Sequence, residues 1–189
     1  GKQPSGPIVW SFAGTSFDGL TANYNAKISY TDTALKIVPT NAATEGGVGF
    51  KVNLTENNKF YIQDYPYVKI KMKGTTASTK TGRDLMYITT DEASEHYTQF
   101  NFFSRAKGVS TSAIIDTKEE LLTVCDVENN TVLSNTMLNG KLTYHGRLQE
   151  ISFQFGRDIA TDKTMEVEYV AFFSTREEAE SYNWDYCYD

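Results

Sequence analysis

A chain of 189 residues fits a single domain and is long enough to bury a core without a disulfide or metal scaffold. Its net charge of -6 and its pI near 5.0 argue against nucleic acid as a partner, because phosphate binding depends on clustered lysine and arginine side chains. No apolar run approaches the roughly 20 residues needed to cross a bilayer, so membrane insertion is not expected.

The first segment, residues 1–7, is rich in Gly, Pro and Ser and is expected to be a linker remnant. We therefore expect the chain to be one module of a larger multimodular protein. Residues 8–182 are predicted to form the module itself. Residues 183–189 are predicted to be a tail, because they are too few for another domain.

From residue 8 onward, short runs rich in Thr, Val, Ile and aromatic residues are divided by Gly, Asn and Asp, which is typical of strands joined by turns. The predicted strands are residues 8–13, 26–31, 34–39, 47–53, 67–73, 85–90, 97–104, 121–127, 148–155 and 165–173. No long helical periodicity supplies the crossovers of a parallel sheet. The sequence therefore predicts an all-β fold in which two antiparallel sheets pack as a β-sandwich.

Alternation along each strand assigns its two faces, because successive side chains point to opposite sides. In the strand 67–73, the apolar residues are predicted to point inward. Lys69, Lys71 and Lys73 are predicted to point outward, where a row of lysines keeps a sheet soluble. The predicted core is Val68, Ile70, Met72, Ile88, Phe100, Phe102, Ile151, Phe153 and Tyr169.

The last strand passes into a short acidic helix, which is expected near residues 175–182. Ser174 or Thr175 can cap this helix, and two glutamates follow in the first turn, where the helix dipole favours them. Ala179 and Tyr182 are placed to touch the sheet. A disulfide between Cys125 and Cys187 that holds the tail down and a pair of free thiols both fit the sequence, and they remain alternatives.

The outward face of the middle strands gathers the chemistry that sugar binding needs, which is flat aromatic rings for the apolar side of the sugar and amides for its hydroxyls. The candidate residues are Tyr87, Tyr97, Gln99, Asn101 and Gln154, with His96 and Arg105 at the edge of the face. The alternatives are a site among the polar loops 41–47, 75–83, 91–97 and 140–146, and an ordinary exposed sheet without a ligand.

Five segments, taken in order, resemble β-jelly-roll domains of the carbohydrate-binding-module type. They are residues 12–19 with the turn Phe17-Asp-Gly, then 65–73, 86–91, 148–156 and 166–182. Such modules are attached to secreted or cell-surface glycan-degrading proteins of anaerobic bacteria. The resemblance implies a jelly-roll fold, glycan binding on a sheet face or in loops at one end, and an extracellular or cell-surface location. These modules often stack sugars on exposed tryptophan, whereas Trp10 is expected in the core or at a sheet edge.

The same resemblance commonly implies a structural calcium ion. Calcium prefers hard oxygen ligands, and Asp18 and Glu168 are the candidates to supply them. Asp18 also fits an ordinary turn residue, and Glu168 also fits a side chain that faces solvent. Zinc is not expected, because the two Cys and two His lack the usual close pairs.

An enzyme is not expected from this sequence. Glu166 and Glu168 lie two residues apart on one strand, but the chain lacks the third carboxylate of the jelly-roll glucanase motif and has no Gly-x-Ser-x-Gly elbow. We therefore predict a noncatalytic carbohydrate-binding module that tethers a larger protein to polysaccharide. The alternatives are an adhesion or spacer module with a protein partner, and a small glycoside hydrolase or lyase.

Overall fold

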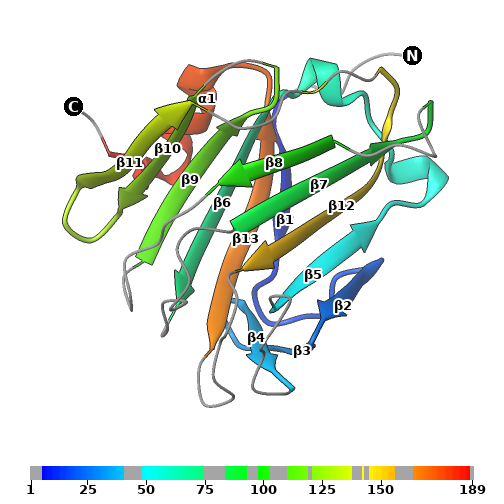
Figure 1. Cartoon of the computed structure of the whole chain (residues 1–189), viewed down its shortest axis with the longest axis horizontal. Helices are drawn as coiled ribbons and strands as arrows, with labels where there is room; N and C mark the ends of the chain where they lie inside the picture. The colour runs from blue at the N-terminus through cyan, green and yellow to red at the C-terminus, as the bar shows by residue number, and fades with distance from the viewer. Residues whose placement is uncertain are drawn as a thin grey trace.

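The computed structural model describes residues 6–40, 48–74, 84–92, 98–102, 110–118, 121–137, 142, 145–155 and 164–187, and in these ranges the chain forms two packed antiparallel sheets (Figure 1). Sheet A has the strand order β11-β10-β9-β6-β13-β4-β3, and β1 also pairs with β13. Sheet B has the order β2-β5-β12-β7-β8. The jelly-roll sandwich with a short C-terminal helix is therefore confirmed.

The strands of sheet A are β1 (Ile8–Ser11), β3 (Ala26–Tyr30), β4 (Leu35–Pro39), β6 (Tyr67–Gly74), β9 (Ser110–Asp116), β10 (Leu121–Asp126), β11 (Thr131–Met137) and β13 (Met165–Phe173). Those of sheet B are β2 (Leu20–Tyr24), β5 (Val48–Asn53), β7 (Asp84–Thr90), β8 (Thr98–Phe102) and β12 (Leu148–Phe155). The helical elements are η1 (Glu56–Asn58), η2 (Ile62–Asp64), α1 (Arg176–Ser181) and η3 (Tyr182–Trp184). No helix in the described ranges is long and apolar enough to cross a membrane.

All ten predicted strands are present, and the described part of the chain contains three further strands that the sequence pattern did not predict. Strands β2 and β11 are edge strands of mostly polar composition. Strand β9 lies inside sheet A, and its residues from Thr111 to Ile115 are buried, so it lacks the alternation of a half-exposed strand. The alternation of apolar and polar residues cannot identify a strand whose polar residues are buried on both faces.

The main core lies between the two sheets and contains the predicted residues Val68, Ile70, Met72, Ile88, Ile151 and Phe153. Phe100 and Phe102 belong to β8, whose side chains lie outside the described part of the structure. Tyr169 is buried as predicted, but it belongs to a second cluster on the other face of sheet A. The reason is a β-bulge at Glu168, where the register between β13 and β6 shifts and exchanges the faces of the residues that follow.

The second cluster exists because the chain folds back over the outward face of sheet A. We call residues 176–187 the C-terminal strap; it comprises α1, η3 and the residues up to Cys187. Thr175 caps α1, since its hydroxyl oxygen accepts a hydrogen bond from the backbone N–H of Glu178 (3.2 Å). Ala179 is buried, and the ring of Tyr182 lies 5.2 Å from that of Tyr169 and 5.4 Å from that of Phe173, measured between centroids. The predicted cap and the predicted contacts with the sheet are confirmed.

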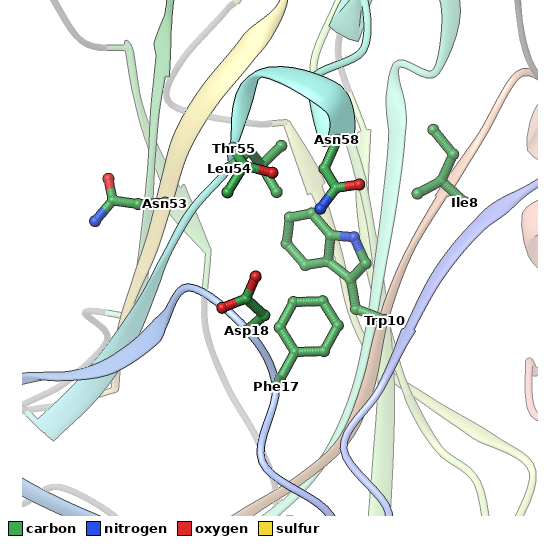
Figure 2. Close-up of a pocket in the computed structure, with 8 residues that line it drawn as sticks. All are labelled: Ile8, Trp10, Phe17, Asp18, Asn53, Leu54, Thr55 and Asn58. Atoms are coloured by element: carbon green, nitrogen blue, oxygen red, sulfur yellow. The ribbon is translucent and has the colours of Figure 1, made fainter.

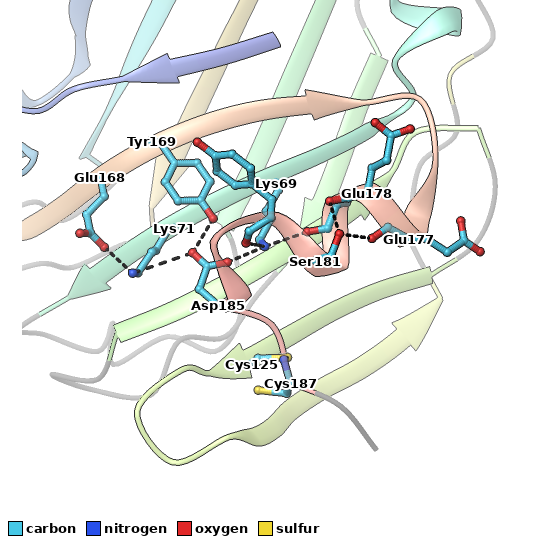
Figure 3. A network of polar contacts seen from close by, with 12 residues as sticks. Lys69, Lys71, Cys125, Glu168, Tyr169, Glu177, Glu178, Ser181, Asp185 and Cys187 are labelled. Carbon is cyan, nitrogen blue, oxygen red and sulfur yellow. Dashed lines mark hydrogen bonds and ion pairs between the residues drawn. The ribbon is translucent and has the colours of Figure 1, made fainter. Parts of the chain in front are cut away.

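The strap overturns the prediction that Lys69 points into solvent. Lys69 is fully buried, and its Nζ lies 2.5 Å from Oδ1 of Asp185 in the strap (Figure 3). The same Nζ donates hydrogen bonds to the carbonyl oxygens of Ala179 (2.8 Å) and Tyr182 (3.1 Å). Burial lowers the pKa of Lys69, and the contact with Asp185 opposes this effect. The lysine is therefore a tether for the strap.

The carboxylate of Asp185 has further partners on the sheet. The hydroxyl of Tyr169 donates a hydrogen bond of 2.6 Å to Oδ2 of Asp185, and Nζ of Lys71 lies 3.8 Å from the same oxygen. Asp185 is only 4% exposed. Burial, followed by the charge of Asp185, raises the pKa of Tyr169, so its hydroxyl keeps the proton that it donates. One strap carboxylate thus bridges β6 and β13.

Cys125 and Cys187 are reduced in this structure, and both are buried where the strap meets β10. The backbone N–H of Cys187 donates to Sγ of Cys125 (3.3 Å), and Sγ of Cys187 donates to the carbonyl oxygen of Asp126 (3.4 Å). Burial raises the pKa of Cys125 to about 12, although the hydrogen bond from the backbone N–H of Cys187 opposes this effect. The thiol therefore stays protonated at neutral pH.

The buried ion pair leads to a first prediction. Lys69→Met leaves the carboxylate of Asp185 buried without its nearest cation, so the free energy of unfolding should fall by about 3 kcal/mol or more in urea denaturation. Lys73→Met is the matched control, because Lys73 lies on the same strand face and is exposed, and it should change stability by less than about 0.5 kcal/mol. Equal losses in the two variants would contradict the role of Lys69.

The Cys125 thiol leads to a second prediction. The unfolded chain releases this proton from about pH 9, whereas the folded chain holds it to about pH 12, so stability falls as pH rises through this window. Between pH 9 and pH 10 the wild type should lose about 1 kcal/mol more than Cys125→Ala. Urea denaturation at each pH measures this difference in slope. Parallel pH profiles of the two proteins would show that the thiol is not shielded by folding.

Candidate ligand-binding face

Strand register builds the outward face of sheet B, on which most of the residues are polar. One row across the sheet contains Thr21, Lys51, Ser152, Tyr87 and Gln99. The next row contains Asn23, Gly49, Gln154, Leu85 and Asn101. The two rows therefore bring tyrosine, hydroxyl and amide residues together across the five strands, with the buried Leu85 among them.

The structure brings together the backbone positions of four of the seven predicted ligand-binding residues. Tyr87 pairs with Gln99 on one side and with Ser152 on the other, and Leu85 lies between Gln154 and Asn101. The side chains of Gln99 and Asn101 lie outside the described part of the structure. His96, Tyr97 and Arg105 also fall outside the described residues.

The middle of this face is recessed, which the sequence did not indicate. Gln154 and Ser152 point outward as predicted, but they are only 6% and 7% exposed, and Tyr87 is half-buried. Gly49 lies opposite Gln154 and adds no side chain to the row. A Cβ at Gly49 would collide with the carbonyl oxygen of Phe153, so glycine is needed at this point. The predicted amide partner at Gln154 is thus set below the surface.

An arginine at one end of the face holds its two central strands. Arg147 precedes β12, and Asp91 follows β7. Oδ1 of Asp91 accepts a hydrogen bond from the backbone N–H of Arg147 (2.9 Å), and Oδ2 accepts one from its Nε (2.8 Å). Nη2 of Arg147 also lies 2.5 Å from Oε1 of Glu56, and this hydrogen bond lowers the pKa of Glu56. This corner therefore fixes the strands that carry Tyr87 and Gln154.

The two candidate calcium ligands lie in different surroundings. Oε2 of Glu168 lies 3.1 Å from Nζ of Lys71 on the strap side of sheet A, so its charge is already matched. Asp18 is exposed on the rim of a pocket of about 330 Å³ that Trp10 and Phe17 line (Figure 2). Within the described ranges, no three His, Cys, Asp or Glu side chains gather where they could hold a metal ion. Glu168 is thus paired with a lysine, and Asp18 is the candidate that lines a pocket.

The pocket beside Asp18 is a feature that sequence reasoning missed. Its walls come from β1, from the turn after residue 16, from the end of β5 and from η1. No local pattern joins the two stretches that form it, residues 8–18 and 53–58. Trp10 was expected in the core or at a sheet edge; it is 6% exposed and packs against Phe172, with ring centroids 4.7 Å apart.

No protein-family model matches the chain, and no curated protein matches its sequence. The family 11 carbohydrate-binding module of a cellulosomal cellulase of Clostridium thermocellum resembles it with a TM-score of 0.51 at 9% identity, over 92% of this chain and 97% of that chain. The exoplasmic/lumenal domain of VIP36, in a Ca2+-bound form, gives 0.53 at 9% identity, over 89% and 90%. The low-affinity xylan-binding module CBM86 of Roseburia intestinalis gives 0.49 at 10% identity, over 92% and 99%. At such identities the likeness to the family 11 module and to the VIP36 domain establishes the β-sandwich fold alone.

Proposed function

We propose that this chain is a noncatalytic glycan-binding module that tethers a larger secreted or surface protein to polysaccharide. The observation that carries the proposal is the asymmetry of the two outward sheet faces. The strap covers sheet A around Lys69 and Tyr169, whereas sheet B presents a recessed row of tyrosine, hydroxyl and amide groups. The fold shared with the family 11 carbohydrate-binding module supports the same proposal.

The chemistry of the sheet B face suits a sugar chain. An aromatic ring such as Tyr87 offers a flat apolar surface to the C–H side of a pyranose ring. The amides of Gln99, Asn101 and Gln154 offer both donors and acceptors to sugar hydroxyls. Because the central polar groups are recessed, a chain lying across the strands would be shielded from water on one side, which strengthens its hydrogen bonds.

The placement of the carboxylates favours binding over catalysis. Glu166 pairs in register with Lys73 and Lys36, and Glu168 forms an ion pair with Lys71 (3.1 Å). A retaining glycosidase needs two carboxylates about 5 to 5.5 Å apart, one on each side of the scissile bond. Glu168, which Lys71 holds in an ion pair, does not offer that arrangement with Glu166. A tethering module instead acts by proximity, and several weak sites on one protein raise the effective concentration of each.

A third prediction tests the sheet B face. A glycan array identifies the polysaccharide that the wild type binds, and calorimetry then compares variants on its oligosaccharide. Tyr87→Ala should weaken binding by about 1 kcal/mol or more, because it removes a stacking ring. Tyr61→Ala is the matched control, since Tyr61 is an exposed tyrosine outside this face, and it should bind like the wild type. Unchanged affinity in Tyr87→Ala would move the site off this face, and no glycan binding by the wild type would favour the adhesion or spacer alternative.

A fourth prediction concerns calcium, which we propose at Asp18, where amide and hydroxyl oxygens also line the pocket. An ion that binds only the folded chain stabilises it by mass action, by about 2.7 kcal/mol at a hundredfold excess over the dissociation constant. Chelator should therefore lower the melting temperature of the wild type but not that of Asp18→Asn. A wild-type melting curve that is identical with chelator and with added calcium would end this proposal.

A further inference from the structure

We infer that the pocket beside Trp10 is a second ligand site, which takes a single neutral sugar unit at the end of a glycan. It shares the class of ligand with the proposed function but none of the residues of the sheet B face. Its floor is apolar and aromatic, with Trp10 and Phe17, and its rim is polar, with Asp18, Asn53, Thr55 and Asn58. Figure 2 shows the amide of Asn58 above the indole of Trp10 and the carboxylate of Asp18 beside the ring of Phe17.

The floor of the pocket is rigid. Strand β1 pairs with β13 and fixes Trp10 opposite Val170. The indole lies 4.7 Å from the ring of Phe172 and 5.6 Å from the ring of Phe17, measured between centroids. Phe17 is also held by its backbone N–H, which donates a hydrogen bond of 3.1 Å to the hydroxyl of Tyr30. A ligand would therefore meet a preformed aromatic surface and would not have to order it on binding.

The rim is held by backbone hydrogen bonds. Leu20 N–H donates to the carbonyl oxygen of Phe17 (3.1 Å) and closes a turn that presents Asp18. Gly19 has a φ of +82°, and a Cβ there would collide with the carbonyl oxygen of Asn53. The N–H of Asn53 donates to the carbonyl oxygen of Gly19 (3.0 Å). Only glycine allows this close approach, so the turn and the end of β5 place Asp18 and Asn53 on one rim.

The combination of floor and rim is what a pyranose requires. The ring C–H groups of a sugar contact aromatic surfaces, while its hydroxyls donate to a carboxylate and exchange hydrogen bonds with amides. A volume of about 330 Å³ lies at the small end of ligand pockets, so it suits the end of a glycan better than an extended chain. Asp18 is the charged residue in the lining, and without a bound cation its charge disfavours uronic acids and sialic acids by repulsion. The ligand class is therefore a neutral terminal sugar.

The chain carries its own reporter for this site. It has two tryptophans, and Trp184 is 81% exposed on the strap while Trp10 lines the pocket. Trp184→Phe leaves Trp10 as the only source of tryptophan fluorescence. In this background we would titrate the methyl glycosides of glucose, galactose, xylose and N-acetylglucosamine, with glucuronate as the charged counterpart. At least one neutral glycoside should change the Trp10 emission saturably, and glucuronate should not.

Variants on the rim then locate the ligand. Asp18→Ala removes a charged acceptor and should weaken binding of the responding glycoside at least tenfold. Asn58→Ala should weaken it less but measurably. Asn57→Ala and Asp32→Ala are the matched controls, because both residues are exposed and neither lines the pocket, and they should bind like the background protein. Parallel titrations with added calcium and with chelator distinguish a sugar that contacts Asp18 directly from a sugar that binds only when an ion is present.

The outcomes distinguish this site from the sheet B face. A Trp10 response that Asp18→Ala weakens and Tyr87→Ala leaves unchanged supports the pocket. No response to any neutral glycoside, while polysaccharide binding persists and depends on Tyr87, overturns the pocket and leaves the proposed function intact. A response that survives in both Asp18→Ala and Asn58→Ala also overturns it, because the sugar then lies elsewhere. Failure of both glycosides and polysaccharides overturns the pocket and the proposed function together.

Discussion

The contact between Lys69 and Asp185 is the interaction on which the arrangement of this molecule depends. A lysine in the middle of a sheet can be buried only if its charge and its hydrogen-bond donors are matched, and here one carboxylate and two carbonyl groups of the strap provide the match. Because these partners all come from residues 179–185, the strap has one place to lie. Its aromatic rings then cover the outward face of sheet A around β13, and the second hydrophobic cluster forms beneath it.

Because the strap covers sheet A, the outward faces of the two sheets differ, and the positions of the proposed sites follow from this difference. With the strap in place, strands β6, β9 and β13 are covered on both faces, while sheet B has buried polar side chains, Ser152 and Gln154, on its face away from the core. The recess around Gln154 and the pocket beside Trp10 both lie away from the strap, and different segments build them. The fold therefore supports two distinct candidate sites, one formed by side chains of neighbouring strands and one formed by a pocket with an aromatic floor.

The alternation of residues in the sequence was sufficient to assign side chains to faces wherever a strand has one buried and one exposed face. It placed Val68, Ile70 and Met72 in the core and grouped Tyr87 with Gln154 on one outward face. It failed at Lys69, because a third layer of chain covers the outward face there. It also failed at Tyr169, because the bulge at Glu168 exchanges the faces partway along β13. The pocket could not be predicted, because pairing between distant segments brings its walls together. The alternation of residues within one segment does not show which distant segment will lie beside it.

The buried tether also changes how the strap can open. Segments at the margin of a domain usually fray first, at little cost, because few buried contacts hold them. Lifting residues 182–187 would instead expose an apolar cluster and separate a lysine from its carboxylate at the same moment. A partly open strap would therefore gain little conformational freedom, yet it would lose most of the contacts that a fully open strap loses. The strap should open together with the sheet beneath it, as one cooperative unit, and offer proteases no loose segment to cut.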